Sequence, residues 1–258
     1  MHAMGSSSSQ QYKLMFSVVL VVAAASLCFA DDPFICTRAT YYGSPECYGN
    51  PSGACGYGEY GRTVYNGQVS GVSRLYRNGT GCGACYQVRC KIAAHCSDEG
   101  TEVVATDYGE GHYTDFILST PAYANLAKPN MAAELFAYGV VDVEYRRIPC
   151  RYASNLVIKV HERSSYPHYL AVVPIYQSGT TDITALQIWQ EDCKEWREMR
   201  RVYGAVWDTQ SPPLGAAISL KLQIVGTANA EAKWVQLSSV IAADWKAGLT
   251  YDAAIQLN

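Results

Sequence analysis

Charged side chains are scarce in this chain, at 17% of the 258 residues, and neither sign of charge dominates. Lys and Arg together number 20 against 23 Asp and Glu, which gives a formal net charge of -3. Such a chain lacks the basic surface with which proteins attract nucleic acid or anionic lipid. We therefore expect neither as a partner. Tyrosine, by contrast, is abundant at 20 residues, a composition that suits an uncharged partner with flat apolar faces, as sugar rings have.

Long hydrophobic runs are missing after the first thirty residues. The uncharged apolar run Leu14–Ala30 follows Lys13 and ends in Cys28-Phe29-Ala30, with small residues where a signal peptidase cleaves. We predict a signal peptide at residues 1–30, a mature chain that begins near Asp31, and secretion to the extracellular region. A membrane anchor is the alternative, but the run is short for a bilayer and two acidic residues and a proline follow it directly. No membrane contact is expected after cleavage.

Cysteine is nearly absent from the second half, where only Cys193 follows Cys150. Nine cysteines remain after the predicted cleavage, so at least one is unpaired or bonded to another chain, and Cys193 is the obvious candidate. A disulfide-dense half joined to a disulfide-poor half indicates two separate cores. We predict a first domain at residues 31–152 and a second at residues 153–258.

The cysteine pair Cys82-x-x-Cys85 also allows a zinc site as an alternative to disulfides. A structural zinc site needs a second pair of ligands, and a secreted protein meets an oxidising compartment. We therefore predict no metal and no other cofactor.

Short β-prone runs separated by turn residues fill the second half and predict a β-sandwich. In one of them Ile218, Leu220, Leu222 and Ile224 alternate with polar residues, so that one face is buried and the other is wet. The predicted strands are 156–160, 169–175, 183–189, 202–207, 218–225, 235–241 and 251–257.

The first half is also predicted to be mostly β, with strands at 40–43, 86–91, 102–106 and 140–146 among Gly-rich loops. One helix is predicted from Thr120 as N-cap through Pro121 in its first turn to Lys128, because Pro129 stops it.

Ordered motifs across both halves resemble those of plant expansins. They are Thr40–Gly43, Gly53–Gly58, Cys82–Tyr86, Thr106-Asp107, Ile148–Cys150, Tyr169, Trp196, Tyr203–Trp207 and Leu249–Tyr251. The run Thr114–Ser119 resembles the expansin-like branches, and the whole pattern looks most like expansin-like A. The match covers essentially the entire predicted mature chain.

This resemblance implies a double-psi β-barrel, similar to that of family 45 glycoside hydrolases, followed by an immunoglobulin-like β-sandwich that binds cellulose or related wall glycans. It also implies disulfides between Cys55 and Cys82, Cys85 and Cys150, and Cys90 and Cys96. From parity and nearness in sequence we add a pair between Cys36 and Cys47.

Hydrolysis of a glycosidic bond normally requires two carboxyl groups, one as proton donor and one as base or nucleophile. Asp107 matches one acid of the family's groove, whereas the position of the other is occupied by Ile117. Asp115 lies two residues before Ile117, about 7 Å away along an extended strand. Replacement of the missing acid by Asp115 stays open. The loop after Thr40–Gly43, which carries a further acid in lytic relatives, offers only Glu46. We predict a protein that is not an enzyme, with Asp107 and Asp115 as vestigial candidates.

Aromatic residues are the candidates for glycan binding, because their rings stack on the CH-rich faces of sugars. By resemblance the barrel groove uses Thr40, Tyr42, Tyr57 and Asp107, and the sandwich presents Tyr169, Trp196 and Tyr203. The family usually carries Trp at the position of Tyr203, so weaker stacking is expected. Trp207 and Trp234 are predicted to be core residues.

Asn78-Gly79-Thr80 is an acceptor motif for an N-linked glycan and predicts a surface loop. Three classes of function remain open: a non-hydrolytic binder that remodels cell wall polysaccharide, a family 45-like glycoside hydrolase, and a barwin-like carbohydrate-binding defence protein. Release of reducing ends would favour the hydrolase, and the aromatic sandwich argues against the barwin-like protein, which lacks one. We favour the first class, acting as a monomer.

Overall fold

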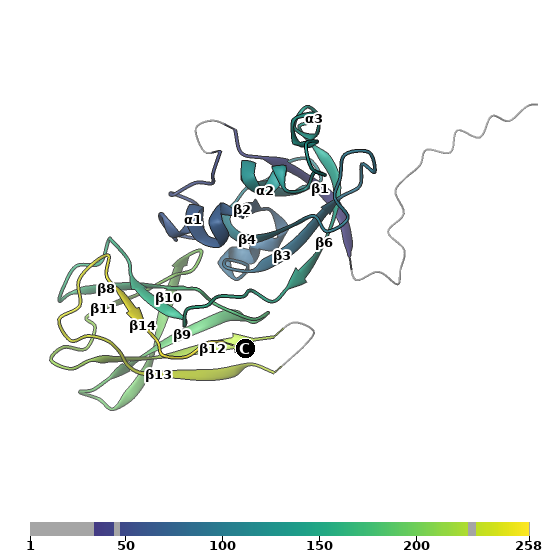
Figure 1. Ribbon diagram of the computed structural model, residues 1–258. Helices are drawn as coiled ribbons and strands as arrows, with labels where there is room; N and C mark the ends of the chain where they lie inside the picture. The colour runs from purple at the N-terminus through teal and green to yellow at the C-terminus, as the bar shows by residue number, and fades with distance from the viewer. Residues whose placement is uncertain (1–33, 44–46, 227–230, 258) are drawn as a thin grey trace, which may run out of the picture.

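A computed structural model describes residues 34–43, 47–226 and 231–257 and shows two β-rich parts joined near residue 150 (Figure 1). The predicted signal peptide at residues 1–30 and the acidic candidate Glu46 lie outside the described residues. Within those residues no helix is long and apolar enough to cross a bilayer. They also contain no group of three or more His, Cys, Asp or Glu side chains suited to a metal ion.

The first part is a closed six-stranded barrel with the strand order β1-β5-β2-β4-β3-β6. Two of its strand pairs, β1 with β5 and β2 with β4, are parallel, and the other pairs are antiparallel. The strands are β1 (Ile35–Tyr41), β2 (Val69–Val72), β3 (Cys85–Cys90), β4 (Thr101–Tyr108), β5 (Thr114–Leu118) and β6 (Val141–Ile148). The helices are α1 (Tyr60–Gly67), the 3-10 helix η1 (Arg74–Gly79), α2 (Thr120–Ala124) and α3 (Ala132–Phe136).

The barrel core is formed by alternate residues of these strands, as the period of a pleated strand requires. Tyr86, Phe116 and Tyr145 meet there edge to face, with ring centroids 5.1 to 5.9 Å apart. The N-cap of helix α2 is Ser119 rather than the predicted Thr120, because the Ser119 hydroxyl accepts a hydrogen bond from the Ala122 amide. The helix ends at Ala124, so the prediction of a helix through Lys128 is too long. The sequence prediction missed β2, β5, α1 and α3.

Disulfides stabilise the barrel in the predicted arrangement. Cys55–Cys82, Cys85–Cys150 and Cys90–Cys96 are formed, with Cα–Cα distances of 5.6, 5.2 and 5.5 Å. The predicted pair between Cys36 and Cys47 is wrong, since Cys47 is a free thiol. Cys193 is also free and lies exposed, as the odd count predicted.

The second part is an eight-stranded sheet in the order β13-β12-β9-β10-β11-β8-β7-β14, folded over on itself. Strands β7, β8 and β11 contribute to the same core as β9, β12 and β13, which makes the two halves of the sheet the layers of a sandwich. The strands are β7 (Val157–Val160), β8 (Tyr169–Ile175), β9 (Asp182–Gln190), β10 (Glu195–Tyr203), β11 (Val206–Gln210), β12 (Ile218–Val225), β13 (Lys233–Ile241) and β14 (Thr250–Asp252).

The predicted strand at 202–207 is two strands in the structure. Gly204 has a φ of +48° and turns the chain from β10 into β11. Trp207 is 4% exposed and lies in the core as predicted. Trp234 is 42% exposed, so its assignment to the core was wrong: it lies opposite Gln223, which faces away from the alternating apolar residues of β12.

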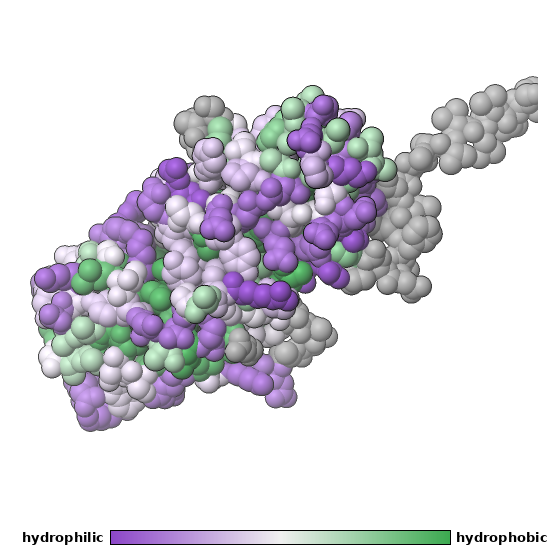
Figure 2. All heavy atoms as spheres, in the orientation of Figure 1, coloured by the Kyte–Doolittle hydropathy of each residue, from purple (hydrophilic) through white to green (hydrophobic). Residues whose placement is uncertain are grey.

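The barrel and the sandwich share a packed interface. Cys55, Tyr57 and Cys82 of the barrel lie in one buried cluster with Ala171, Val173 and other residues of the sandwich. The Ala205 amide donates to the Cys55 carbonyl at 3.0 Å. Asp182 accepts from Arg77 at 2.7 Å and from Arg147 at 3.2 Å. On the face drawn in Figure 2, hydrophobic and hydrophilic residues are interspersed over both parts.

Candidate functional site

Asp107 lies at the end of β4 as a buried hydrogen-bond acceptor. Its Oδ1 accepts from the Ala54 amide at 2.6 Å and from the Tyr108 amide at 2.8 Å. Its Oδ2 accepts from the Tyr42 hydroxyl at 3.2 Å. Burial, together with the Asp107 charge, raises the pKa of Tyr42 far above its ordinary value, so the phenol keeps the proton that it donates. Asp107 thus accepts three hydrogen bonds and fixes the loop at Ala54.

The strand register places Ile117 of β5 level with Asp107 of β4, with β2 between them. Gly71 of β2 pairs with Asp107 on one side and with Ile117 on the other. Adjacent strands are about 4.8 Å apart, so the backbones of these two residues are separated by about 10 Å. The position at which the resemblance implies a second acid thus carries a hydrocarbon side chain, one strand beyond Gly71.

Gly71 leaves room for Tyr42 between these two positions. A Cβ atom on residue 71 would lie 2.6 Å from the Tyr42 hydroxyl oxygen. The phenol consequently lies over the glycine and fills the space between the strands that carry Asp107 and Ile117. The sequence analysis missed this role of Gly71, which follows from the strand pairing.

Asp115 is held by three donors on two other segments, β1 and the start of η1. Its Oδ2 accepts from the Thr37 hydroxyl at 2.8 Å and forms an ion pair with Arg74 at 2.6 Å. Its Oδ1 accepts from the Ser73 hydroxyl at 2.8 Å. Both oxygens of this carboxyl group are therefore engaged within the barrel. Asp115 is thus held in a separate set of contacts, none of which involves Asp107.

The other two barrel candidates differ in accessibility. Thr40 is half-buried, and its hydroxyl donates to the Gly139 carbonyl at 2.9 Å. Tyr57 is only 3% exposed, because the sandwich covers it. Its prediction as a groove residue is therefore wrong, and it acts as part of the interface.

A cavity of about 500 Å³ connects the loop beside Asp107 with the sandwich. Tyr203 lines it and is 37% exposed. Its hydroxyl lies 3.2 Å from His161 Nε2, and His161 Nδ1 accepts from the Arg163 amide at 3.1 Å. Burial lowers the pKa of His161, which favours the neutral imidazole with its proton on Nε2. Other lining residues come from both parts: Pro51, Ser52, Gly53, Ala54, Gly56, Gly58, Glu162 and Arg163.

The predicted aromatic residues of the sandwich do not form one platform. Tyr169 is half-buried and donates to Asp208 at 3.0 Å, and Asp208 also pairs with Arg200. Trp196 lies seven residues before Tyr203 on β10, about 23 Å along the strand. There it contacts Trp189, with ring centroids 5.3 Å apart, and Lys221 lies 4.3 Å from its ring centre. Trp196 therefore shares no aromatic platform with Tyr203.

Comparisons with known proteins agree with this architecture. A family model described as the expansin C-terminal domain matches residues 156–242, and the model DPBB_1, described as lytic transglycolase, matches residues 68–145. Expansin-like B1 of Arabidopsis thaliana is 58% identical over 246 residues, 95% of this chain and 97% of that protein. Expansin-like A2 of the same plant is 38% identical, over 96% of this chain and 93% of that protein. The expectation that the chain is most like expansin-like A is therefore corrected in favour of B.

Solved structures show the same fold at low sequence identity. The crystal structure of apo Clavibacter michiganensis expansin has a TM-score of 0.63 at 18% identity and covers 86% of this chain and 97% of that one. A mutant of that expansin in complex with cellohexaose gives the same score and identity, over 86% of this chain and 98% of that one.

Proposed function

Because the chain belongs to the expansin family, in its expansin-like branch, we propose that it is a secreted plant cell wall protein that binds polysaccharide without hydrolysing it. The observation that carries this proposal is the strand register, in which Gly71 pairs with Asp107 on one side and with Ile117 on the other. General acid–base cleavage needs a protonated group opposite the ionised one, and isoleucine has no proton to give. We expect the barrel face that carries Tyr42, Asp107 and Ile117, called the groove below, to hold a glycan chain intact.

The ligand that fits this groove is a wall glycan such as cellulose. The path from Asp107 to the cavity at Tyr203 offers a carboxylate, a phenol, an imidazole and an accessible ring, which match the hydroxyls and apolar faces of sugars. The cellohexaose complex of the bacterial expansin supports this choice. Binding would compete with glycan-to-glycan hydrogen bonds and so remodel the wall.

Glycosylation at Asn78 remains a prediction within this proposal. Asn78 is exposed in η1 and next to Arg77, which pairs with the sandwich. A glycan there would emerge beside the interface between the two parts.

Replacing Tyr203 with alanine should reduce retention of the purified protein on cellulose about fivefold to tenfold. The expected loss corresponds to about 1–1.4 kcal/mol, the size of one aromatic contact. The measurement is the bound fraction in a cellulose pull-down over a range of protein concentrations. Trp196→Ala is the matched control, because that ring lies far along β10, and it should retain nearly full binding. Equal losses in both variants would place the glycan elsewhere.

A further inference from the structure

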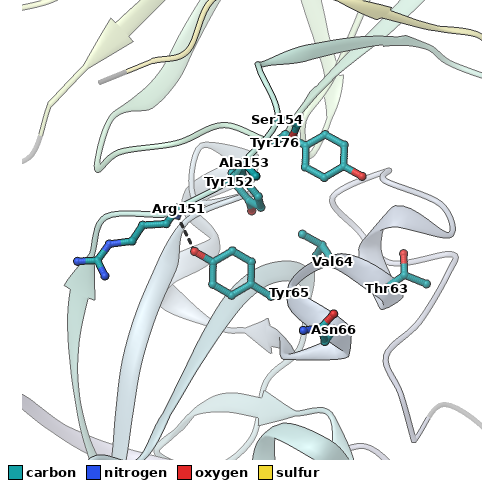
Figure 3. Close-up of a pocket in the computed structure, with 9 residues that line it drawn as sticks. All are labelled: Thr63, Val64, Tyr65, Asn66, Arg151, Tyr152, Ala153, Ser154 and Tyr176. Atoms are coloured by element: carbon teal, nitrogen blue, oxygen red, sulfur yellow. Dashed lines mark hydrogen bonds between the residues drawn. The ribbon is translucent and has the colours of Figure 1, made fainter.

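A second cavity lies where the barrel, the connecting segment and the sandwich meet, apart from the groove. It has a volume of about 720 Å³ and shares no lining residue with the cavity at Tyr203. Three chain segments line it: residues 63–66 of α1, residues 151–154 of the connection, and Tyr176 after β8 (Figure 3). We call it the junction cavity.

Three tyrosine rings form the aromatic wall of the junction cavity. Tyr152 meets Tyr65 with ring centroids 5.3 Å apart and Tyr176 at 5.4 Å, in both cases edge to face. All three are half-buried, so part of each ring borders the cavity. Tyr152 is itself anchored, because its hydroxyl accepts from Tyr60 at 3.4 Å. The wall is thus fixed in place before any ligand arrives.

Polar groups at the rim of the junction cavity are available to a ligand. The Asn66 amide and the Arg151 guanidinium have no hydrogen-bond or ion-pair partner among the described residues, and both side chains are exposed. Tyr65 accepts from the Arg151 backbone amide at 2.6 Å, which leaves its hydroxyl proton free to be donated (Figure 3). Burial raises the pKa of Tyr65, so that proton is retained.

The backbone of α1 is bent to present these groups. Tyr65 and Asn66 have φ angles of 52° and 56°, in the left-handed region that few residues other than glycine adopt. Strained backbone of this kind persists only where the surrounding structure enforces it, and it is concentrated at binding sites. Here the bond from the Arg151 amide and the ring contact with Tyr152 hold Tyr65 in place.

We propose that the junction cavity is a second sugar site, which takes one or two pyranose units of a neutral matrix polysaccharide. Flat rings beside amide, hydroxyl and guanidinium donors are the chemistry that recognises an uncharged pyranose. The choice of sugar as ligand rests on the proposed function, whereas the cavity itself does not. Since both parts contribute residues, a bound sugar would also stiffen the joint between them.

The test is a titration of the ¹⁵N-labelled full-length mature protein with cellotriose and xylotriose, followed by backbone amide shifts. The proposal expects concentration-dependent shifts at residues 63–66, 151–154 and 176, with the Arg151 amide among the largest. It also expects Asn66→Gly to weaken this binding about fivefold, the effect of losing one or two neutral hydrogen bonds. Glycine suits the positive φ of residue 66, so this variant should fold.

Tyr203→Ala is the control variant and should leave these shifts unchanged. Shifts confined to residues 52–56, 161–163 and 203, or none at millimolar trisaccharide, would overturn the proposal. A response to tri-galacturonate alone would overturn the assignment to a neutral sugar. Failure of this titration is distinguishable from failure of the proposed function. The loss of cellulose retention in Tyr203→Ala tests the cavity at Tyr203, which shares no lining residue with the junction cavity.

Discussion

Replacing Gly204 with alanine is expected to lower the free energy of unfolding by about 2–4 kcal/mol and to weaken cellulose binding with it. A Cβ atom on residue 204 would lie 2.3 Å from the Ala54 carbonyl oxygen and 2.5 Å from Cys55 Cα. Both are backbone atoms of the barrel, so no side-chain rotation relieves the collision. Overpacking costs about 1–3 kcal/mol, and alanine at positive φ adds about 1 kcal/mol.

Gly248→Ala is the matched control for this prediction. Gly248 has a φ of +82° but no atom within 4 Å of its would-be Cβ, so only the conformational cost applies. Urea unfolding of both variants measures the difference. Equal destabilisation would show that the barrel and the sandwich are not packed as closely at Gly204 as described. Because Tyr203 precedes the glycine, displacement of the turn should also lower retention on cellulose.

Asp107→Ala should destabilise the protein by about 3 kcal/mol, a second large effect. The substitution leaves the Ala54 and Tyr108 amides and the Tyr42 hydroxyl without their acceptor. Fully buried donors that lose their acceptor cost about 1–3 kcal/mol each, and the access of water to these part-buried donors reduces the sum. Asp107→Asn should cost less, since its side-chain oxygen can still accept from both amides.

Asp98→Ala is the control for Asp107→Ala, because it removes the same charge from an exposed residue. Its expected effect lies within about 0.5 kcal/mol. Thermal unfolding of Asp107→Ala, Asp107→Asn and Asp98→Ala measures the loss of stability in each. An Asp107→Ala protein as stable as Asp98→Ala would contradict the anchoring role of this carboxylate.

Local sequence patterns predicted the structural features that depend on residues close together in the chain. Alternation in Ile218, Leu220, Leu222 and Ile224 predicted a half-buried strand, and β12 is that strand. The ordered motifs, through the resemblance, predicted the barrel, the sandwich and three disulfides. The Gly204 turn was missed because β-prone residues flank it on both sides.

Features that depend on long-range packing could not be predicted from the sequence. Asp115 meets Arg74 forty-one positions away, and only the pairing of distant strands brings them together. Tyr57 is buried because the sandwich docks on the barrel, which no local pattern reports. The placement of Asp107 and Ile117 on either side of Gly71 likewise depends on the register of β2 between β4 and β5. The resemblance named both positions without giving their geometry.

The most direct test of a non-hydrolytic barrel is the release of reducing ends from soluble β-glucan and xyloglucan by the purified mature protein. The account predicts no release above that of the Asp107→Asn variant, because Ile117 supplies no proton opposite Asp107. Sustained release by the wild type that disappears in Asp107→Asn would contradict it and show that another group acts as the acid.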